Sequence, residues 1–129
     1  MVSLGNERFI VPEALFQPSL LGIESAGIHE AIVTSIAMCD PSIHQDLFCN
    51  VVLSGGNTNF RGLAQRLTTE IARLAPPAMK VHVVAPNCRS CSAWLGGSIF
   101  TVHENFRHIF VQAEEYKEWG PSIVRRKCF

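Results

Sequence analysis

The sequence lacks an excess of charge of either sign. Its 129 residues contain eleven Lys and Arg side chains and eleven Asp and Glu side chains, so no overall field attracts the protein to nucleic acid. Arg125, Arg126 and Lys127 form the one basic cluster, and three residues are too few for a nucleic-acid footprint. We therefore expect no nucleic-acid partner.

The sequence also lacks a long apolar run and a leader peptide. No apolar run approaches the roughly 20 residues that a membrane-spanning helix needs. Residues 1–4, Met-Val-Ser-Leu, do not place a charged stretch before an apolar one as a signal peptide does. We therefore expect a soluble, cytoplasmic protein that makes no contact with a membrane.

Regularly spaced cysteine pairs are absent too. The five cysteines, an odd number, stand at positions 39, 49, 88, 91 and 128, which argues against a disulfide scaffold and for a reducing compartment. Cys88 and Cys91 do form one C-x-x-C motif, which is typical of a redox pair or, with Cys39, Cys49 or His82, of a zinc site. A third interpretation is two ordinary cysteines in a surface loop, and without a second C-x-x-C we favour it.

What the sequence has is a strand–helix–strand pattern. Short apolar runs at 50–54 and 79–85 predict buried strands. The helix predicted between them, at 62–74, carries Arg66, Thr69 and Arg73 on its outer face and, on its buried face, Leu63, Leu67, Ile71 and Leu74. A right-handed crossover of this length makes the two strands parallel. The fold class is therefore α/β, with a βαβ unit.

Further helices are predicted on both sides of this unit. Before it, residues 5–27 are expected to be irregular, a helix is expected at 27–39, and a capping box of Ser42 and Gln45 predicts a short helix to residue 48. His29 is expected to make local hydrogen bonds. After the unit, helices are predicted at 90–102, 104–110, 112–119 and 122–127.

The first of these C-terminal helices has an unusual composition. Gly96 and Gly97 lie in its middle, where each glycine costs roughly 1 kcal/mol relative to alanine. We therefore expect them to pack closely against another backbone. Its aromatic residues and those that follow are expected to fill a core: Trp94, Phe100, Phe106 and Phe110.

The most informative stretch is the turn after the first strand, Ser54-Gly55-Gly56. Adjacent glycines between a strand and a helix permit a positive φ and let a phosphate approach backbone N–H groups. The stretch has neither the G-x-G-x-x-G nor the G-x-x-x-x-G-K-[ST] spacing, so a plain tight turn remains an alternative. Because two parallel strands are too few for an independent sheet, we expect the chain to be part of a larger fold.

Several blocks of the sequence resemble actin. The resemblance runs from Gly5 to the last residue, so that only residues 1–4 fall outside it. It is carried by residues 5–9, 12–18, 27–30, 53–56, 74–76, 96–99, 120–124 and 126–129. The last block, Arg-Lys-Cys-Phe, is nearly identical to the end of actin. Together these blocks are far more specific than any one of them.

The resemblance implies about the C-terminal third of an actin-family chain, a partial ribonuclease-H-like domain of the actin-like ATPase fold. On this basis residues 1–27 are a connecting segment, residues 28–89 belong to the inner, nucleotide-side subdomain, and residues 90–129 are the C-terminal helices of the barbed-end subdomain. The family's other phosphate hairpins, its metal-associated aspartate and its water-positioning glutamine match no residue of this chain. We therefore expect no hydrolysis by these residues alone.

The resemblance also implies a nucleotide, ATP with magnesium in the parent fold. It assigns nucleotide contacts to Gly55, Gly56, Asn57, Asn59 and Phe60. Asn57 and Asn59 replace a threonine and a methionine of common actins, and Phe60 replaces a tyrosine. Ser90 stands where actin has a lysine close to the adenine.

A second implied surface is the groove at the barbed end, where helical partners dock. Its rim corresponds to Ile99, Phe100, His103, Asn105 and Ile109, of which His103 and Asn105 depart from actin. The expected partners are actin-family subunits and actin-binding proteins. We expect an actin-like cytoskeletal protein that binds ATP and assembles into or onto filaments. The alternatives are a non-polymerising, nucleotide-free interaction module that uses this groove and, more remotely, a C-x-x-C redox or metal protein.

Overall fold

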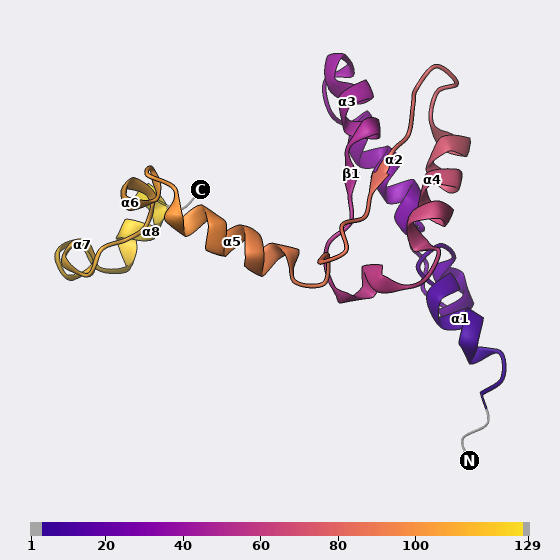
Figure 1. Cartoon of the computed structure of the whole chain (residues 1–129), viewed down its shortest axis with the longest axis horizontal. Helices are drawn as coiled ribbons and strands as arrows, with labels where there is room; N and C mark the ends of the chain where they lie inside the picture. The colour runs from indigo at the N-terminus through magenta and orange to yellow at the C-terminus, as the bar shows by residue number, and fades with distance from the viewer. Residues whose placement is uncertain (1–3, 128–129) are drawn as a thin grey trace. The chain divides into compact units, whose positions relative to one another are not determined.

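The computed structural model describes residues 4–127, with the backbone alone for Arg107, and the chain divides into two compact units. The first unit comprises residues 1–91 and the second residues 92–129. Figure 1 shows the elements of each unit in the order of the chain. No helix among the described residues is both long enough and apolar enough to cross a membrane.

The first unit contains a two-stranded parallel sheet with helices around it (Figure 1). Its elements are α1 (Glu7–Glu13), α2 (Ile28–Ala37), α3 (His44–Cys49), β1 (Val51–Val52), α4 (Leu63–Leu74) and β2 (Val83–Val84), with 3₁₀ turns at Pro18–Leu21, Pro41–Ile43 and Gly56–Asn59. In the sheet Val51 lies opposite Val83 and Val52 opposite Val84. The prediction of two parallel strands joined by a helix is confirmed.

The strands are shorter than the apolar runs that predicted them. Hydrogen bonds continue the pairing on both sides, from the His82 N–H to the Phe48 carbonyl at 3.0 Å and from the Leu53 N–H to the Val84 carbonyl at 2.9 Å. The side chain of Val52 is exposed, so the described residues leave part of this small sheet uncovered. The structure is therefore compatible with part of a larger α/β domain.

The core of the first unit lies between α4, α2, α3 and the strands. It consists of Phe16, Ile36, Phe48, Leu53, Leu63, Leu67, Ile71 and Ala75. Leu67 and Ile71 are fully buried, and with Leu63 they confirm three of the four apolar positions predicted for α4. Leu74, in contrast, is 48% exposed. It is the last residue of α4, and the following residue, Ala75, turns to an extended conformation and occupies the core instead.

Two expectations for the first unit were wrong. Residues 5–27 are not wholly irregular, because α1 forms within them. Pro12 lies inside this helix and removes one backbone donor, but the bonds from the Ile10 N–H to the Asn6 carbonyl and from the Ala14 N–H to the Ile10 carbonyl still form. The capping box of Ser42 and Gln45 does not form, because α3 begins after Ile43 without a side-chain cap. Asp40 instead caps the preceding 3₁₀ turn, where its Oδ1 accepts from the Ser42 N–H at 2.8 Å.

The second unit is helical, as predicted. It contains α5 (Ser92–Val102), α6 (Phe106–Ile109), α7 (Ala113–Trp119), a 3₁₀ turn at Gly120–Ile123 and α8 (Val124–Lys127). Lys127 Nζ binds Glu115 Oε1 at 2.6 Å and the Phe110 carbonyl at 3.2 Å, and the Arg126 guanidinium lies 4.5 Å from the centre of the Trp119 ring. These contacts join α8 to α6 and α7.

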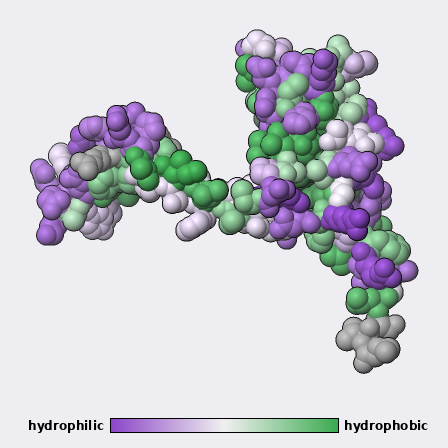
Figure 2. Space-filling model, viewed as in Figure 1, coloured by the Kyte–Doolittle hydropathy of each residue, from purple (hydrophilic) through white to green (hydrophobic). Residues whose placement is uncertain are grey.

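Helix α5 contradicts two expectations. Its residues have no buried side chain, and Trp94 is 75% exposed, so Trp94 and Phe100 do not fill a core within the described residues. Phe106 of α6, in contrast, is half-buried and packs against the rings of Phe100 and Phe110. A Cβ added to Gly96 or Gly97 would meet no atom within 4 Å, so the expected close backbone contact is not made by any described residue. Figure 2 shows hydrophobic residues at the surface along α5.

Candidate functional site

The glycine turn follows β1 directly and has the backbone geometry that its sequence predicted. Gly55 has φ +95° and ψ +160°, a conformation that residues with a Cβ rarely adopt. Gly56 opens the 3₁₀ turn Gly56–Asn59, and Phe60 ends it. A Cβ built on Gly55 or on Gly56 would meet no atom within 4 Å. The surface above both glycines is therefore open to a ligand.

The turn is fastened to the loop that follows β2. The Gly55 N–H donates to the Arg89 carbonyl at 2.7 Å, and Arg89 Nε donates to the Thr58 carbonyl at 3.0 Å. Thr58 Oγ1 donates to the Gly55 carbonyl at 2.6 Å. The Gly55 N–H is therefore committed to the protein itself and is not directed at a phosphate.

Sequence reasoning missed Arg89. A usable signal was present, because the carboxyl ends of parallel strands lie at the same edge of a sheet. The loop after β2 must therefore approach the turn after β1, and Arg89 is the side chain in that loop with several donors.

The five predicted nucleotide residues lie together along this one turn. Asn57, Asn59 and Gly56 are exposed, and Gly55 is half-buried. Phe60 is also exposed and lines a hollow of about 250 Å³ at the start of α4, together with Phe9 and Pro12 of α1. Four of the five residues are therefore exposed, and of the five only Phe60 lines this hollow.

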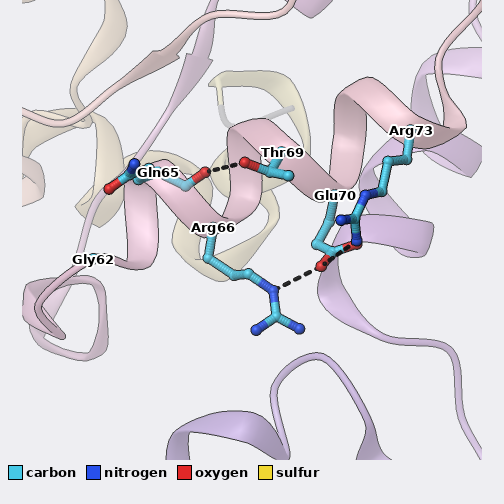
Figure 3. A pocket seen from close by; sticks show the side chains of 6 residues that line it. All are labelled: Gly62, Gln65, Arg66, Thr69, Glu70 and Arg73. Carbon is cyan, nitrogen blue, oxygen red and sulfur yellow. Dashed lines mark hydrogen bonds and ion pairs between the residues drawn. The ribbon is translucent and has the colours of Figure 1, made fainter.

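A second hollow, of about 460 Å³, lies on the outer face of α4. Figure 3 shows the residues that line it: Gly62, Gln65, Arg66, Thr69, Glu70 and Arg73. Arg66 Nε binds Glu70 Oε1 at 2.7 Å, and an Arg73 nitrogen binds Glu70 Oε2 at 3.1 Å. A further Arg66 nitrogen lies 3.0 Å from Glu13 Oε1. Because each charge already has a partner, we interpret this cluster as a link between α1 and α4.

The pKa of the Glu70 carboxyl reflects two opposing effects. Its burial raises the pKa, but the hydrogen bonds and charges of Arg66 and Arg73 outweigh this, and the net pKa lies below the ordinary value. Glu70 therefore stays ionised and is held between two cations. This is the electrostatic arrangement of a structural ion pair rather than that of an acid–base catalyst.

No metal centre forms among the described residues. No group of three or more His, Cys, Asp or Glu side chains lies close enough there to hold an ion. Cys39, Cys49, Cys88 and Cys91 are free thiols, whereas Cys128 lies outside the described residues. The zinc alternative for the C-x-x-C motif therefore has no ligand set in residues 4–127.

His29 does not make the local hydrogen bonds expected of it through Nδ1. That atom is buried and has no hydrogen-bond partner. The ring instead packs on Phe16, with the ring centres 5.7 Å apart, and it lies over Gly27, where an added Cβ would come within 2.7 Å of it. His29 therefore has a packing role.

The five predicted groove residues lie at the corner between α5 and α6. Ile99 is 65% exposed, and Phe100 and Ile109 are exposed as well. His103 Nδ1 accepts from the Asn105 N–H at 3.3 Å, which shapes the turn between the helices. The ring of Phe100 meets that of Phe106 edge-on at 5.6 Å between ring centres. The corner thus presents apolar side chains at the surface of the second unit.

Comparison with known protein families settles the relationship of the chain. The family model described as Actin matches residues 1–129, the whole chain. The chain belongs to the actin family. The match also includes residues 1–4, which the sequence blocks did not reach. Actin-family membership implies the actin-like ATPase fold, with which the parallel strand pair and its surrounding helices are compatible.

Proposed function

We propose that the protein is a divergent cytoskeletal member of the actin family that binds ATP with magnesium and assembles into or onto filaments. In this proposal the chain supplies one wall of the nucleotide cleft of a ribonuclease-H-like fold and acts in the cytoplasm. The observation that carries it is the open surface above Gly55 and Gly56, at the carboxyl end of β1. Ligands of α/β proteins bind at the carboxyl ends of the strands.

The residues of the turn fit part of a nucleotide. Gly56 leaves room for close approach of a ligand, and the exposed side chains of Asn57 and Asn59 provide amide donors and acceptors. Phe60 provides an apolar ring face. Since the Gly55 N–H is bonded to Arg89, the groups of this chain that would hold ATP are those from Gly56 to Phe60. A bound magnesium ion would supply charge compensation to the phosphates.

We assign binding, and no catalytic step, to these residues. Hydrolysis of ATP needs a positioned water and a metal held beside the phosphates. No residue of this chain matches the groups that perform these tasks in the family. The proposed role is therefore to hold the nucleotide on one side.

The test is titration of the full chain with a fluorescent ATP analogue in the presence of magnesium. Gly56→Ala is the informative variant, because its methyl group would meet no protein atom yet would occupy the space proposed for the ligand. Gly56 is not among the glycines with positive φ, so the variant should fold. We expect its affinity to fall by about tenfold or more.

A matched control is Gly97→Ala, whose methyl group also meets no atom within 4 Å but lies in the second unit. We expect unchanged affinity. Absence of saturable binding by the unmodified chain would contradict a nucleotide function for these residues. Equal binding by the unmodified chain and Gly56→Ala would contradict the location of the site.

A second candidate function is that of a non-polymerising, nucleotide-free interaction module. It is favoured by the exposed apolar side chains of Ile99, Phe100 and Ile109, which a helical partner could cover. The partners would be actin-family subunits or actin-binding proteins. Sedimentation of the chain alone and with actin distinguishes the candidates. The interaction module would pellet with actin, would not pellet alone and would bind no nucleotide. Phe100→Ser should abolish its pelleting with actin.

A further inference from the structure

The Cys88-Arg89-Ser90-Cys91 segment forms a tight hydrogen-bonded turn. The Cys91 N–H donates to the Cys88 carbonyl at 3.0 Å, and Cys91 Sγ lies 3.4 Å from the same carbonyl oxygen. The preceding turn overlaps with it, since the Arg89 N–H donates to the Pro86 carbonyl at 3.2 Å. Both cysteines are exposed and carry free thiols.

This geometry places the two cysteines within reach of each other. The first and last Cα atoms of a four-residue turn lie less than about 7 Å apart, and a disulfide requires a Cα separation of roughly 4.4–6.8 Å. The loop that the bond would close contains only Arg89 and Ser90. Formation of the bond therefore needs adjustment of side-chain torsions more than movement of the backbone.

We propose that Cys88 and Cys91 are a site of reversible disulfide formation, with a low-molecular-weight disulfide such as oxidised glutathione as the co-substrate. The observation that distinguishes the pair from ordinary surface cysteines is the turn that holds them together. Cys39 and Cys49 have no second cysteine in the same turn, although their sulfur atoms, like that of Cys91, lie near backbone carbonyls, those of Ser35 and Lys80.

The chemistry is two successive thiol–disulfide exchanges. The thiolate of one cysteine attacks the small disulfide, forms a mixed disulfide and releases one small thiolate. The thiolate of the other cysteine then attacks the protein sulfur of the mixed disulfide and releases the second small thiolate. The two cysteines lose two protons and two electrons in total, and the small disulfide is reduced to two thiols.

The modification would act on the glycine turn through Arg89, which lies between the two cysteines. Its carbonyl accepts from the Gly55 N–H at 2.7 Å, and its Nε donates to the Thr58 carbonyl at 3.0 Å. A disulfide across the turn would restrict the opening of the backbone at Arg89. The hydrogen bond to Gly55 should therefore open less often in the oxidised protein. Neither the disulfide nor this coupling depends on the proposed nucleotide function.

The first experiment equilibrates the full chain in buffers of defined ratios of reduced to oxidised glutathione. Thiols are then trapped by alkylation, and the digested protein is analysed by mass spectrometry. We expect the peptide with Cys88 and Cys91 to become two hydrogen masses lighter and unalkylated, while Cys39 and Cys49 stay alkylated. Relative to the chain in concentrated guanidinium chloride, the folded turn should favour this disulfide by about tenfold or more.

Single-cysteine variants test the two-step course. Cys88→Ser and Cys91→Ser each leave one thiol without its partner, so each should accumulate a mixed disulfide with glutathione that the unmodified chain does not. A Cys88–Cys91 bond that forms equally well in the folded and unfolded chain would overturn the proposal, as would stable mixed disulfides on both cysteines of the unmodified chain.

The coupling to the glycine turn is measured by amide hydrogen exchange. On oxidation we expect exchange of the Gly55 amide to slow by about threefold or more, because opening of its bond to Arg89 is restricted. The Ala75 amide, which donates to Ile71 at 2.8 Å at the end of α4, should exchange at an unchanged rate. An unchanged or faster rate at Gly55 would overturn the coupling.

Discussion

The two units differ most in what they do with their apolar side chains. The first unit buries eight hydrophobic residues in one cluster, whereas Ile123 is the one buried hydrophobic residue among the described residues of the second. Helix α4 and helix α5 show the cause. Leu63, Leu67 and Ile71 gather on one face of α4, whereas α5 is apolar on all sides, has no charged residue and buries none of its side chains.

The comparison shows that apolar content alone does not predict a core. A helix that is apolar on one face packs on a neighbour from its own unit, while a helix that is apolar all round needs partners on several sides. The second unit is held instead by local contacts, above all those of Lys127 with Glu115 and of Arg126 with Trp119. We therefore expect the first unit to have the greater stability and the second to gain most from a partner.

The largest effect is expected from Leu67→Ala in the first unit. Leu67 is fully buried in α4, so removal of its side chain leaves a cavity and should lower the free energy of unfolding of this unit by about 2–5 kcal/mol. Leu74→Ala is the matched control, because it makes the same change at an exposed position of the same helix. Its cost should be under about 1 kcal/mol.

The measurement can separate the two units. Both tryptophans, Trp94 and Trp119, lie in the second unit, so tryptophan emission during urea unfolding reports on that unit, and amide exchange of α4 reports on the first. Leu67→Ala should accelerate exchange in α4 and leave the emission transition in place. An equal acceleration of α4 amide exchange by Leu67→Ala and Leu74→Ala would contradict the described core.

Patterns within one element and the pairing of the two strands were predictable from the sequence, whereas individual hydrogen bonds between loops were not. The period of α4 predicted its buried face, and the two apolar runs around it predicted a parallel pair. The parallel strands imply that the loop with Arg89 approaches the glycine turn, but residue types alone do not specify that the Gly55 N–H donates to the Arg89 carbonyl. The groove residues from Ile99 to Ile109 came from the resemblance to actin, since no periodicity of α5 distinguishes one face from another.

The expected burial of Trp94, Phe100 and Phe110 failed for a related reason. Hydrophobicity predicts that a side chain favours burial but does not say which surface covers it. Within the described residues no such surface exists for α5. The formation of α1 was missed because proline and glycine residues were taken to exclude a helix from residues 5–27, whereas Pro12 removes one backbone donor and the seven-residue helix forms around it.

A smaller effect on stability is expected when one glycine in each unit is replaced by alanine. A Cβ on Gly27 would lie 2.2 Å from the Phe16 carbonyl oxygen, a backbone atom that cannot move independently. Gly27→Ala should therefore destabilise the first unit by about 1–3 kcal/mol. Gly96→Ala meets no atom within 4 Å and should stabilise α5 by about 1 kcal/mol. Circular dichroism during thermal unfolding measures both.

This pair of variants sharpens the comparison of the units. Opposite signs are expected because the glycine of the first unit lies against its own fold and the glycine of the second does not. If Gly96→Ala instead destabilised the chain, α5 would have to contact another backbone in solution, as the sequence had indicated. In that case α5 would be packed against a partner, and the second unit would not be the unit that leaves its apolar side chains uncovered.

The smallest effect is expected from the loss of the carboxylate in the ion pair between Glu115 and Lys127. The hydrogen bond from Lys127, with a further one from the Gln112 N–H, holds the pKa of Glu115 below its ordinary value of 4.5. A carboxyl whose pKa is lowered on folding stabilises the fold above pH 4.5, and this contribution is lost as the pH falls through the folded-state pKa. Glu115→Gln should therefore lower the unfolding midpoint of the second unit at pH 7 and flatten the decline of this midpoint below pH 4.5.

The control is Glu114→Gln, at an exposed neighbouring position of α7, which should change neither the midpoint nor its pH dependence. Trp119 emission follows the unit during urea unfolding at each pH, and an equal acid dependence of Glu115→Gln and the unmodified chain would show that the Lys127 pair does not hold α8 in place.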